Sequence, residues 1–117
     1  MTSPRPLGPY TPVVRAGDWV VVSGQVGVRS GALVDGGVVA QLNQALANMR
    51  ELLEQQGASL EQVVKCTVFL TDIADFAAMN AVWDFWAVPG QTPARATVQA
   101  KLNDPKMKVE IMVVAAR

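Results

Sequence analysis

The stretch VVKCTVFL, residues 63 to 70, decides the fold. It is apolar and rich in β-branched residues, and it is too short for a full helix, so it predicts a strand. Apolar side chains occur at both alternating sets of positions, which is typical of a strand that is largely buried on both faces. Segments of helical periodicity on either side of it therefore predict a sheet packed against helices.

The segment before this strand predicts a long helix. Apolar residues recur there at intervals of three and four, which places them on one side of a helix: Val39, Leu42, Leu46, Met49 and Leu53. Gly57 follows at a position where a glycine commonly ends a helix in the left-handed conformation. We expect the helix to end just before Gly57.

A second helix is expected after the strand. Asp72 suits its N-cap position, and Asp75 falls in its first turn, where a negative charge complements the helix dipole. A largely aromatic stripe then recurs at intervals of three and four: Phe76, Met79, Trp83 and Trp86. We expect this stripe to pack against the sheet, with part of its surface left to line a pocket.

The remaining segments predict further strands. These are DWVVVSGQVGV at 18–28, with room for a short strand at 32–34, PARATVQA at 93–100 and MKVEIMVVAA at 107–116. The order of elements predicts an α+β sandwich with both helices on one face of the sheet. The strands are too apolar on both faces to leave the other face in water, so we expect another subunit to cover it.

Composition limits the classes of protein and of function. The length of 117 residues suits a single domain over 1–117, and 50% hydrophobic with only 17% charged residues favours an oligomer. Ten basic and ten acidic residues cancel, which is unlike the basic surfaces of nucleic-acid or anionic-membrane binding proteins. The first ten residues hold no apolar stretch typical of a signal peptide and no segment resembles a membrane span, so we expect a cytoplasmic protein.

The sequence contains no histidine and one cysteine, which excludes His-based catalysis and leaves no ligand set for zinc. We expect no metal ion, and we interpret Cys66 as a buried thiol of the core.

Two charged residues in the last predicted strands are candidates for chemistry. Alternation places Arg95, Thr97 and Gln99 on one face of their strand. Glu110 lies among apolar neighbours in VEIMVVA, where a carboxylate must be paired, hydrogen-bonded or neutralised. Arg95 is the obvious possible partner. The two residues either form a structural salt bridge between neighbouring strands or belong to a site in which Arg95 binds a substrate carboxylate and Glu110 acts on a water molecule.

The chain resembles the reactive intermediate/imine deaminase family, also called RidA-like or YjgF-like. The resemblance covers nearly the whole length and rests on these motifs in order: GPY at 8–10, SGQ at 23–25, QALANM at 44–49, VVKCTVFLTD at 63–72, FAAMNAVW at 76–83, PAR at 93–95 and KVEI at 108–111.

The resemblance implies a fold, an assembly and a reaction. The fold is chorismate-mutase-like, and the assembly is a homotrimer with a β-barrel core and one site in each cleft between subunits. The implied reaction is the hydrolysis of 2-imino acids such as 2-iminobutanoate and 2-iminopropanoate, or of enamines such as 2-aminoacrylate, to 2-keto acids and ammonia. The implied reaction needs no cofactor, and removal of these imines would protect pyridoxal-phosphate enzymes.

The resemblance also implies roles for individual residues. Arg95 is similar to the family arginine that binds the substrate carboxylate, and Glu110 to the acid that orients or deprotonates the attacking water. Other positions match residues that shape the cleft: Tyr10, Ser23, Gly24 and Asn80. Thr97 replaces a family cysteine and can hydrogen-bond a carboxylate or water, and Trp83 replaces a frequent tyrosine and either lines the pocket or packs.

Two other functions remain open. A trimeric regulatory module could bind a small carboxylate through Arg95 without turnover, although a desolvated acid beside that carboxylate favours catalysis. A translation-inhibitor or ribonuclease role would need a basic surface and accessible stacking aromatics. Neutral charge and aromatic residues expected only on the helix stripe argue against that role.

Overall fold

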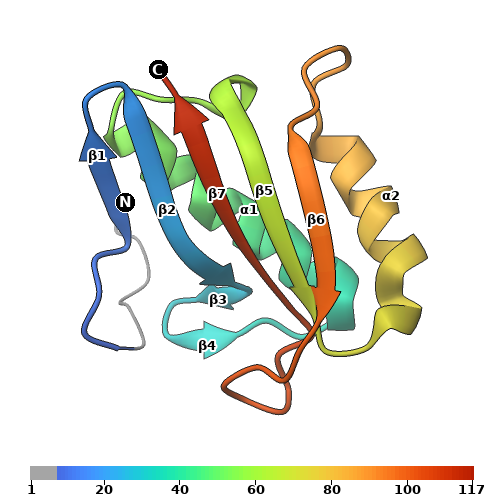
Figure 1. Ribbon diagram of the computed structural model, residues 1–117. Helices are drawn as coiled ribbons and strands as arrows, with labels where there is room; N and C mark the ends of the chain where they lie inside the picture. The colour runs from blue at the N-terminus through green and yellow to red at the C-terminus, as the bar shows by residue number, and fades with distance from the viewer. Residues whose placement is uncertain (1–7) are drawn as a thin grey trace.

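A five-stranded sheet with two helices on one face forms the part of the chain that the computed structural model describes, residues 8–117 (Figure 1). The strands of this sheet, in spatial order, are β1 (Val13–Ala16), β2 (Trp19–Val26), β7 (Val109–Ala116), β5 (Val63–Leu70) and β6 (Ala94–Gln99). A small second sheet pairs β3 (Val28–Arg29) with β4 (Ala32–Leu33). The helices are α1 (Gly37–Gln55) and α2 (Phe76–Trp86), and short 3-10 turns lie at Leu60–Gln62 and Ile73–Asp75.

The strand order corrects one expectation. β6 and β7 are consecutive in the sequence but are not neighbours, because β5 lies between them. β5 pairs with β7 in antiparallel and with β6 in parallel. Parallel strands need a crossover connection, and α2 provides it between β5 and β6. β6 is therefore an edge strand.

Several local predictions are confirmed. The strand at 63–70 has the predicted bounds, and α1 ends just before Gly57, whose φ of 73° is left-handed. Asp72 caps the turn that leads into α2, since its side chain accepts a hydrogen bond of 2.9 Å from the backbone N–H of Ala74. The strand β1 was not predicted.

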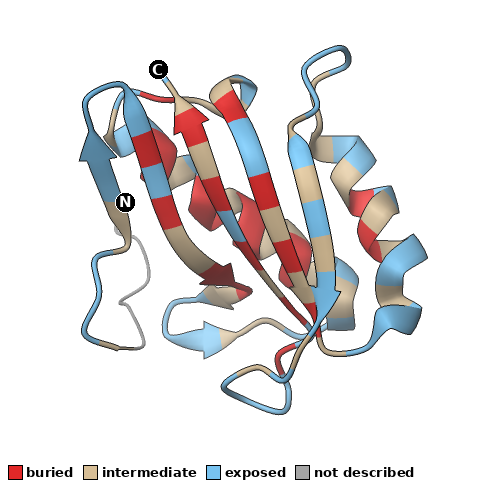
Figure 2. Ribbon diagram, in the orientation of Figure 1, coloured by how far each residue is buried: buried red, intermediate tan, exposed pale blue. Residues whose placement is uncertain are grey.

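The core lies between the sheet and the helices. Along β7 the buried residues alternate with partly exposed ones, and Val109, Ile111 and Val113 face the helices. Figure 2 shows the same alternation as red bands on the central strands. Cys66 is fully buried in this core, as predicted. Val39 was expected on the buried side of α1 but is 46% exposed.

The other face of the sheet is apolar and uncovered in the single chain. Large apolar side chains on this face are more than a third exposed: Val14, Trp19, Val21, Val98 and Met112. The expectation of an apolar uncovered face is thus confirmed for the isolated chain.

Within residues 8–117, no helix is both long and apolar enough to cross a membrane. The expectation that the first ten residues hold no signal peptide falls mostly on residues 1–7, outside the described range.

Candidate functional site

The candidate residues form two groups on opposite faces of the sheet. Strand register explains the separation. Arg95 is paired with Cys66, which is buried under the helices, whereas Glu110 is paired with Phe69, whose side chain points to the other face. One chain therefore does not bring Arg95 and Glu110 together. The structural salt bridge between neighbouring strands, one of the two alternatives, does not form within it.

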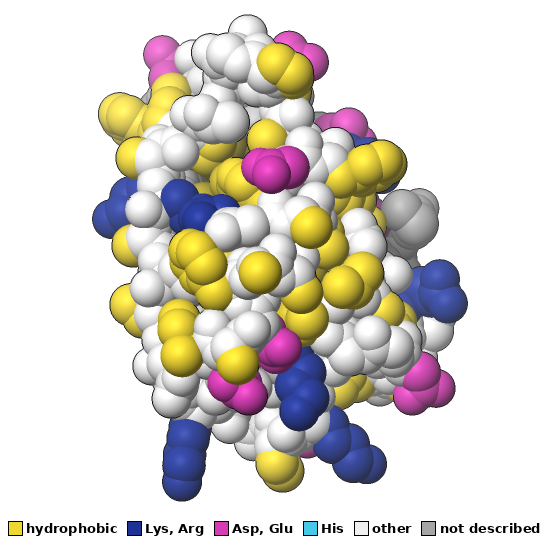
Figure 3. All heavy atoms as spheres, turned by 90° about the vertical axis from the view of Figure 1, so that its right-hand side faces the viewer, with side chains coloured by type: hydrophobic (Ala, Val, Ile, Leu, Met, Phe, Trp, Pro, Cys, Tyr) yellow, Lys and Arg dark blue, Asp and Glu magenta, His cyan; other side chains and the backbone are white. Residues whose placement is uncertain are grey.

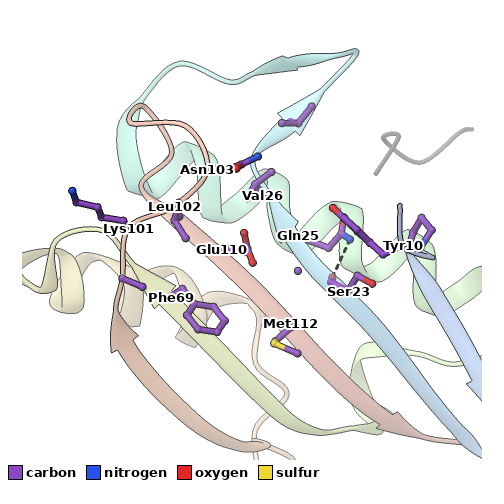
Figure 4. A pocket seen from close by; sticks show the side chains of 14 residues that line it. Tyr10, Ser23, Gln25, Val26, Phe69, Lys101, Leu102, Asn103, Glu110 and Met112 are labelled. Carbon is purple, nitrogen blue, oxygen red and sulfur yellow. Dashed lines mark hydrogen bonds between the residues drawn. The ribbon is translucent and has the colours of Figure 1, made fainter. Parts of the chain in front are cut away.

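The first group lines an open cavity of about 670 Å³ on the uncovered face (Figure 4). Four of the predicted site residues belong to it: Tyr10, Ser23, Gly24 and Glu110. Other lining residues come mainly from β2, β5, β7 and the loop after β6, and were not predicted: Pro12, Gln25, Val26, Val28, Phe69, Ala100, Lys101, Leu102, Asn103 and Met112. The cavity is therefore lined by the carboxyl group of Glu110 and the backbone of Gly24 together with apolar side chains.

A bulge in β2 shapes one wall of the cavity. Val22 pairs with Val113 and Gln25 with Ile111, so two residues, Ser23 and Gly24, occupy the space opposite one residue of β7. Bulges of this kind redirect side chains and often lie beside functional sites.

Ser23 connects this bulge to the segment before β1. Its hydroxyl donates a hydrogen bond of 2.6 Å to the carbonyl of Thr11, and its backbone N–H donates one of 2.8 Å to the carbonyl of Pro12. Since Tyr10 precedes these residues directly, both hydrogen bonds help to fix the segment that carries its ring to the cavity wall.

The Glu110 carboxyl group packs directly on the backbone of Gly24. A Cβ atom added at Gly24 would lie 2.8 Å from Cδ and 3.2 Å from Cγ of Glu110. Real Cβ atoms almost never make a contact as short as the first. The glycine therefore fixes where the carboxyl group can be.

Burial raises the pKa of Glu110 above its usual value, because desolvation disfavours the charged form. The side chain is partly buried, and the structure gives its carboxyl group no hydrogen-bond or ion-pair partner among residues 8–117. Of the options that the sequence left open, pairing does not occur among the described residues, whereas the pKa of the carboxyl group is shifted toward the neutral form. Such a group takes up a proton more readily than an ordinary carboxylate.

The second group surrounds Arg95 where β6 meets α2. The guanidinium donates a hydrogen bond of 2.7 Å to Oδ1 of Asn80 and a longer one of 3.6 Å to the sulfur of Met79. Thr97 lies two residues farther along the same face of β6, and its hydroxyl oxygen is buried without a hydrogen-bond partner in the described structure. Asn80, Arg95 and Thr97 thus share one side of the sheet.

Trp83 does not line the cavity of Glu110. Its ring centroid lies 5.5 Å from Cζ of Arg95, and the ring borders a separate cavity of about 30 Å³ with Leu46, Met49 and Trp86. The tryptophan therefore packs in the helix layer and contacts the second group.

Aromatic residues are not confined to buried stripes, contrary to expectation. Trp19 is 53% and Phe85 85% exposed. The side of the molecule that Figure 3 shows has apolar patches with charged side chains of both signs around them, and no continuous basic stripe. Among residues 8–117, no three Cys, Asp or Glu side chains lie close enough together to hold a metal ion.

Comparison with known proteins gives consistent matches over nearly the whole chain. The model of the endoribonuclease L-PSP family matches residues 1–117. The RutC family protein YoaB of Escherichia coli is 47% identical over 83 residues, 71% of this chain and 73% of YoaB. The mouse protein named 2-iminobutanoate/2-iminopropanoate deaminase is 38% identical, over 98% of this chain and 86% of its own length.

Solved structures agree with these matches. RidA from the Antarctic bacterium Psychrobacter sp. PAMC 21119 superposes with a TM-score of 0.92 at 35% identity, over 98% of this chain and 94% of RidA. E. coli TdcF with bound serine superposes with a TM-score of 0.88 at 32% identity, over 98% and 93% of the two chains. The α+β fold with two helices on a mixed sheet is therefore the fold of these structures. The chain belongs to the endoribonuclease L-PSP family, the family of the YjgF and RidA proteins.

Proposed function

We propose that this protein hydrolyses small 2-imino acids, such as 2-iminobutanoate and 2-iminopropanoate, to 2-keto acids and ammonia. The observation that carries the proposal is the Glu110 carboxyl group, which borders a cavity, has no hydrogen-bond or ion-pair partner among residues 8–117 and has a raised pKa. Two relatives add support: the mouse relative is named for this reaction, and TdcF binds serine, a small amino acid with a carboxylate.

The protein acts as a single domain, residues 1–117, in a homotrimer with its sites between subunits. Arg95 and Glu110 lie on opposite faces of one sheet, so a site that uses both must combine the α2–β6 edge of one subunit with the open face of another. The apolar side chains of the open face would be covered in the same assembly. This arrangement accounts for both groups of residues at once.

In this site Arg95 binds the substrate carboxylate. A guanidinium matches a carboxylate with two parallel hydrogen bonds, which fixes the position of the neighbouring imine carbon. Asn80 holds the guanidinium through its 2.7 Å hydrogen bond, and the hydroxyl of Thr97 is an unused donor on the same side. Tyr10 and Ser23 contribute to the opposite wall.

Glu110 activates water. The imine carbon, already electrophilic when the nitrogen is protonated, is attacked by the water oxygen while Glu110 takes up one of the water protons. Glu110 then returns the proton to the nitrogen of the tetrahedral carbinolamine. As the C–N bond breaks, a lone pair of the hydroxyl oxygen forms the carbonyl group and the hydroxyl proton passes to the departing ammonia, which leaves as ammonium. The products are the 2-keto acid and ammonia, and positioning of the two reactants supplies much of the acceleration.

The chemistry needs no cofactor or metal ion. The imines and their enamine tautomers, such as 2-aminoacrylate, arise from pyridoxal-phosphate enzymes, and their removal in the cytoplasm would protect those enzymes. Spontaneous hydrolysis of the imine means that the protein has only to compete with reaction in water.

The experiment that tests the proposal measures keto-acid release from imines made in situ by an amino-acid oxidase. We expect the unmodified protein to accelerate release from 2-iminobutanoate and 2-iminopropanoate, and the Arg95→Ala and Glu110→Ala variants to lose most of this acceleration. No acceleration by the unmodified protein would refute the deaminase. Retained binding of 2-oxobutanoate in that case would favour a non-catalytic carboxylate-binding module.

A further inference from the structure

One face of α2 is organised around the guanidinium of Arg95. Four side chains at intervals of three and four contact it: Phe76, Met79, Asn80 and Trp83. Residues at this spacing share one face of a helix. The stripe that predicts core packing in the sequence therefore also forms a cradle for a single cation.

The four contacts act on different parts of the guanidinium. Asn80 and Met79 accept hydrogen bonds from the two Nη atoms. The ring centroids of Phe76 and Trp83 lie 5.8 Å and 5.5 Å from Cζ, within the range in which an arginine is attracted to an aromatic face.

Several donors of the guanidinium stay available. A guanidinium has five N–H groups, and two have partners in the described chain, so three remain to receive an oxyanion.

Core packing does not explain the position of Phe76. Its side chain is 41% exposed, whereas Met79 on the same helix face is fully buried. The ring of Phe76 is not part of the core cluster, and it lies within the range of a cation–aromatic attraction to Arg95. Trp83 is partly buried against the core, so it contributes to both.

We propose that Phe76 and Trp83 are positioning residues that hold Arg95 in the orientation required to bind the carboxylate of the substrate. The role of the carboxylate rests on the proposed function, whereas the orientation of Arg95 by the two rings does not. The rings fix the plane of the guanidinium, and Asn80 fixes its rotation within that plane. Arginine side chains otherwise lose considerable rotamer freedom on binding a ligand, and a prearranged one loses less.

The test compares Phe76→Leu and Trp83→Leu with two controls. Phe85→Leu changes an aromatic residue of the same helix that is 85% exposed and makes no ring contact with Arg95 in the described structure. Trp83→Phe keeps an aromatic face in place. Thermal unfolding of each variant shows that it is folded, and Phe76→Leu is the key variant because its ring is the more exposed one.

The first readout is the NMR signal of the Nε–H group of Arg95 without any ligand, identified by its absence in Arg95→Lys. Ring currents should shift this signal away from those of exposed arginines, and Phe76→Leu and Trp83→Leu should move it toward them. Trp83→Phe should largely retain the shift, and Phe85→Leu should leave it unchanged. A signal at the exposed-arginine position in the unmodified protein would overturn the proposal.

The second readout separates positioning from stability. Phe76→Leu should raise KM for 2-iminobutanoate, and Kd for 2-oxobutanoate, roughly 2- to 5-fold, the worth of one exposed cation–aromatic contact, with kcat nearly unchanged. Unchanged KM and Kd in both leucine variants would also overturn the proposal. Absence of turnover by the unmodified protein would instead refute the deaminase, while the NMR signal would still decide the orientation of Arg95.

Discussion

Replacing Gly24 with alanine tests whether the bare backbone of the β2 bulge sets the position of the Glu110 carboxyl group. The φ angle of Gly24 is not in the left-handed region, so alanine can adopt the backbone conformation. The bulge itself should therefore persist. The three heavy atoms nearest to the added methyl group all belong to the side chain of Glu110.

The size of the effect follows from the distances. The new Cβ atom would lie 2.8 Å from Cδ of Glu110, and ordinary contacts begin at 3.4 Å, so the carboxyl group must move by at least 0.6 Å. A displacement of about 1 Å in a catalytic group can reduce the rate by about 100-fold. We expect kcat to fall roughly 10- to 100-fold, and the free energy of unfolding to fall by about 1 kcal/mol because the side chain leaves its preferred rotamer.

The assay combines keto-acid release with urea unfolding of four proteins: the unmodified chain, Gly24→Ala, Glu110→Ala and the double variant. In the Glu110→Ala background the new methyl group meets no carboxyl group, so alanine at position 24 should cost little or no stability there. A stability loss of equal size with and without the Glu110 side chain would refute the steric account. Unchanged activity of Gly24→Ala would refute the assignment of that carboxyl group to the reaction.

Four further predictions concern Asn48, Cys66 and Glu110. Asn48→Ala should lower the free energy of unfolding by about 1–3 kcal/mol in urea titrations, because the buried amide donates hydrogen bonds of 3.2 Å and 2.9 Å to the carbonyls of Val26 and Val28. Native Cys66 should resist thiol reagents at pH 8 and react only on unfolding, because burial, partly offset by Arg95, raises its pKa to about 12; rapid labelling of the folded protein would contradict this. The kcat/KM should rise with pH through the raised pKa of Glu110, because the ionised form is the base, and Glu110→Gln should abolish this rise and lower the rate roughly 100-fold or more. A carboxyl group whose pKa is raised by folding contributes stability at low pH, and this stability is lost as the pH rises through the folded-state pKa. Glutamine cannot ionise, so thermal unfolding should show that Glu110→Gln stabilises the protein more at pH 7 than at pH 4.

Most of the fold could be predicted because local patterns and tertiary structure agree. The helix α1 has its apolar stripe and its final glycine, and β5 is continuous in its apolar character. The strand β1 was not predicted because VVRA is short. Only one of its side chains is partly buried, so buried and exposed residues do not alternate along it. Its pairing with β2 is a tertiary contact that the sequence does not encode locally.

The neighbours of β6 could not be predicted from the last two strands alone. A polar turn between two strands favours a hairpin, yet β6 pairs in parallel with β5 because α2 connects them. This topology separates Arg95 from Glu110, a result that alternation within each strand does not reveal. The residues of the cavity in the loop after β6, such as Lys101 and Asn103, carry no periodic signal at all.

The residues of the candidate site were found by resemblance more than by pattern. Glu110 and Arg95 were the exceptions. A carboxylate within an apolar strand is unusual in any protein, and Arg95 was identified as a possible partner for it. The bulge that places Gly24 beside the Glu110 carboxyl group depends on one extra residue in β2 relative to β7, and that difference appears only when the two strands are paired.

The most direct test of a site shared between subunits is complementation between inactive chains. Arg95→Ala and Glu110→Ala chains are co-expressed with different tags, and mixed assemblies are isolated and assayed for keto-acid release. If each site takes Arg95 from one chain and Glu110 from another, every mixed trimer contains one site of its three in which both residues are intact, so the isolated mixed assemblies should show about a third of the unmodified activity. Mixed assemblies as inactive as either parent, with the unmodified protein active, would contradict the account.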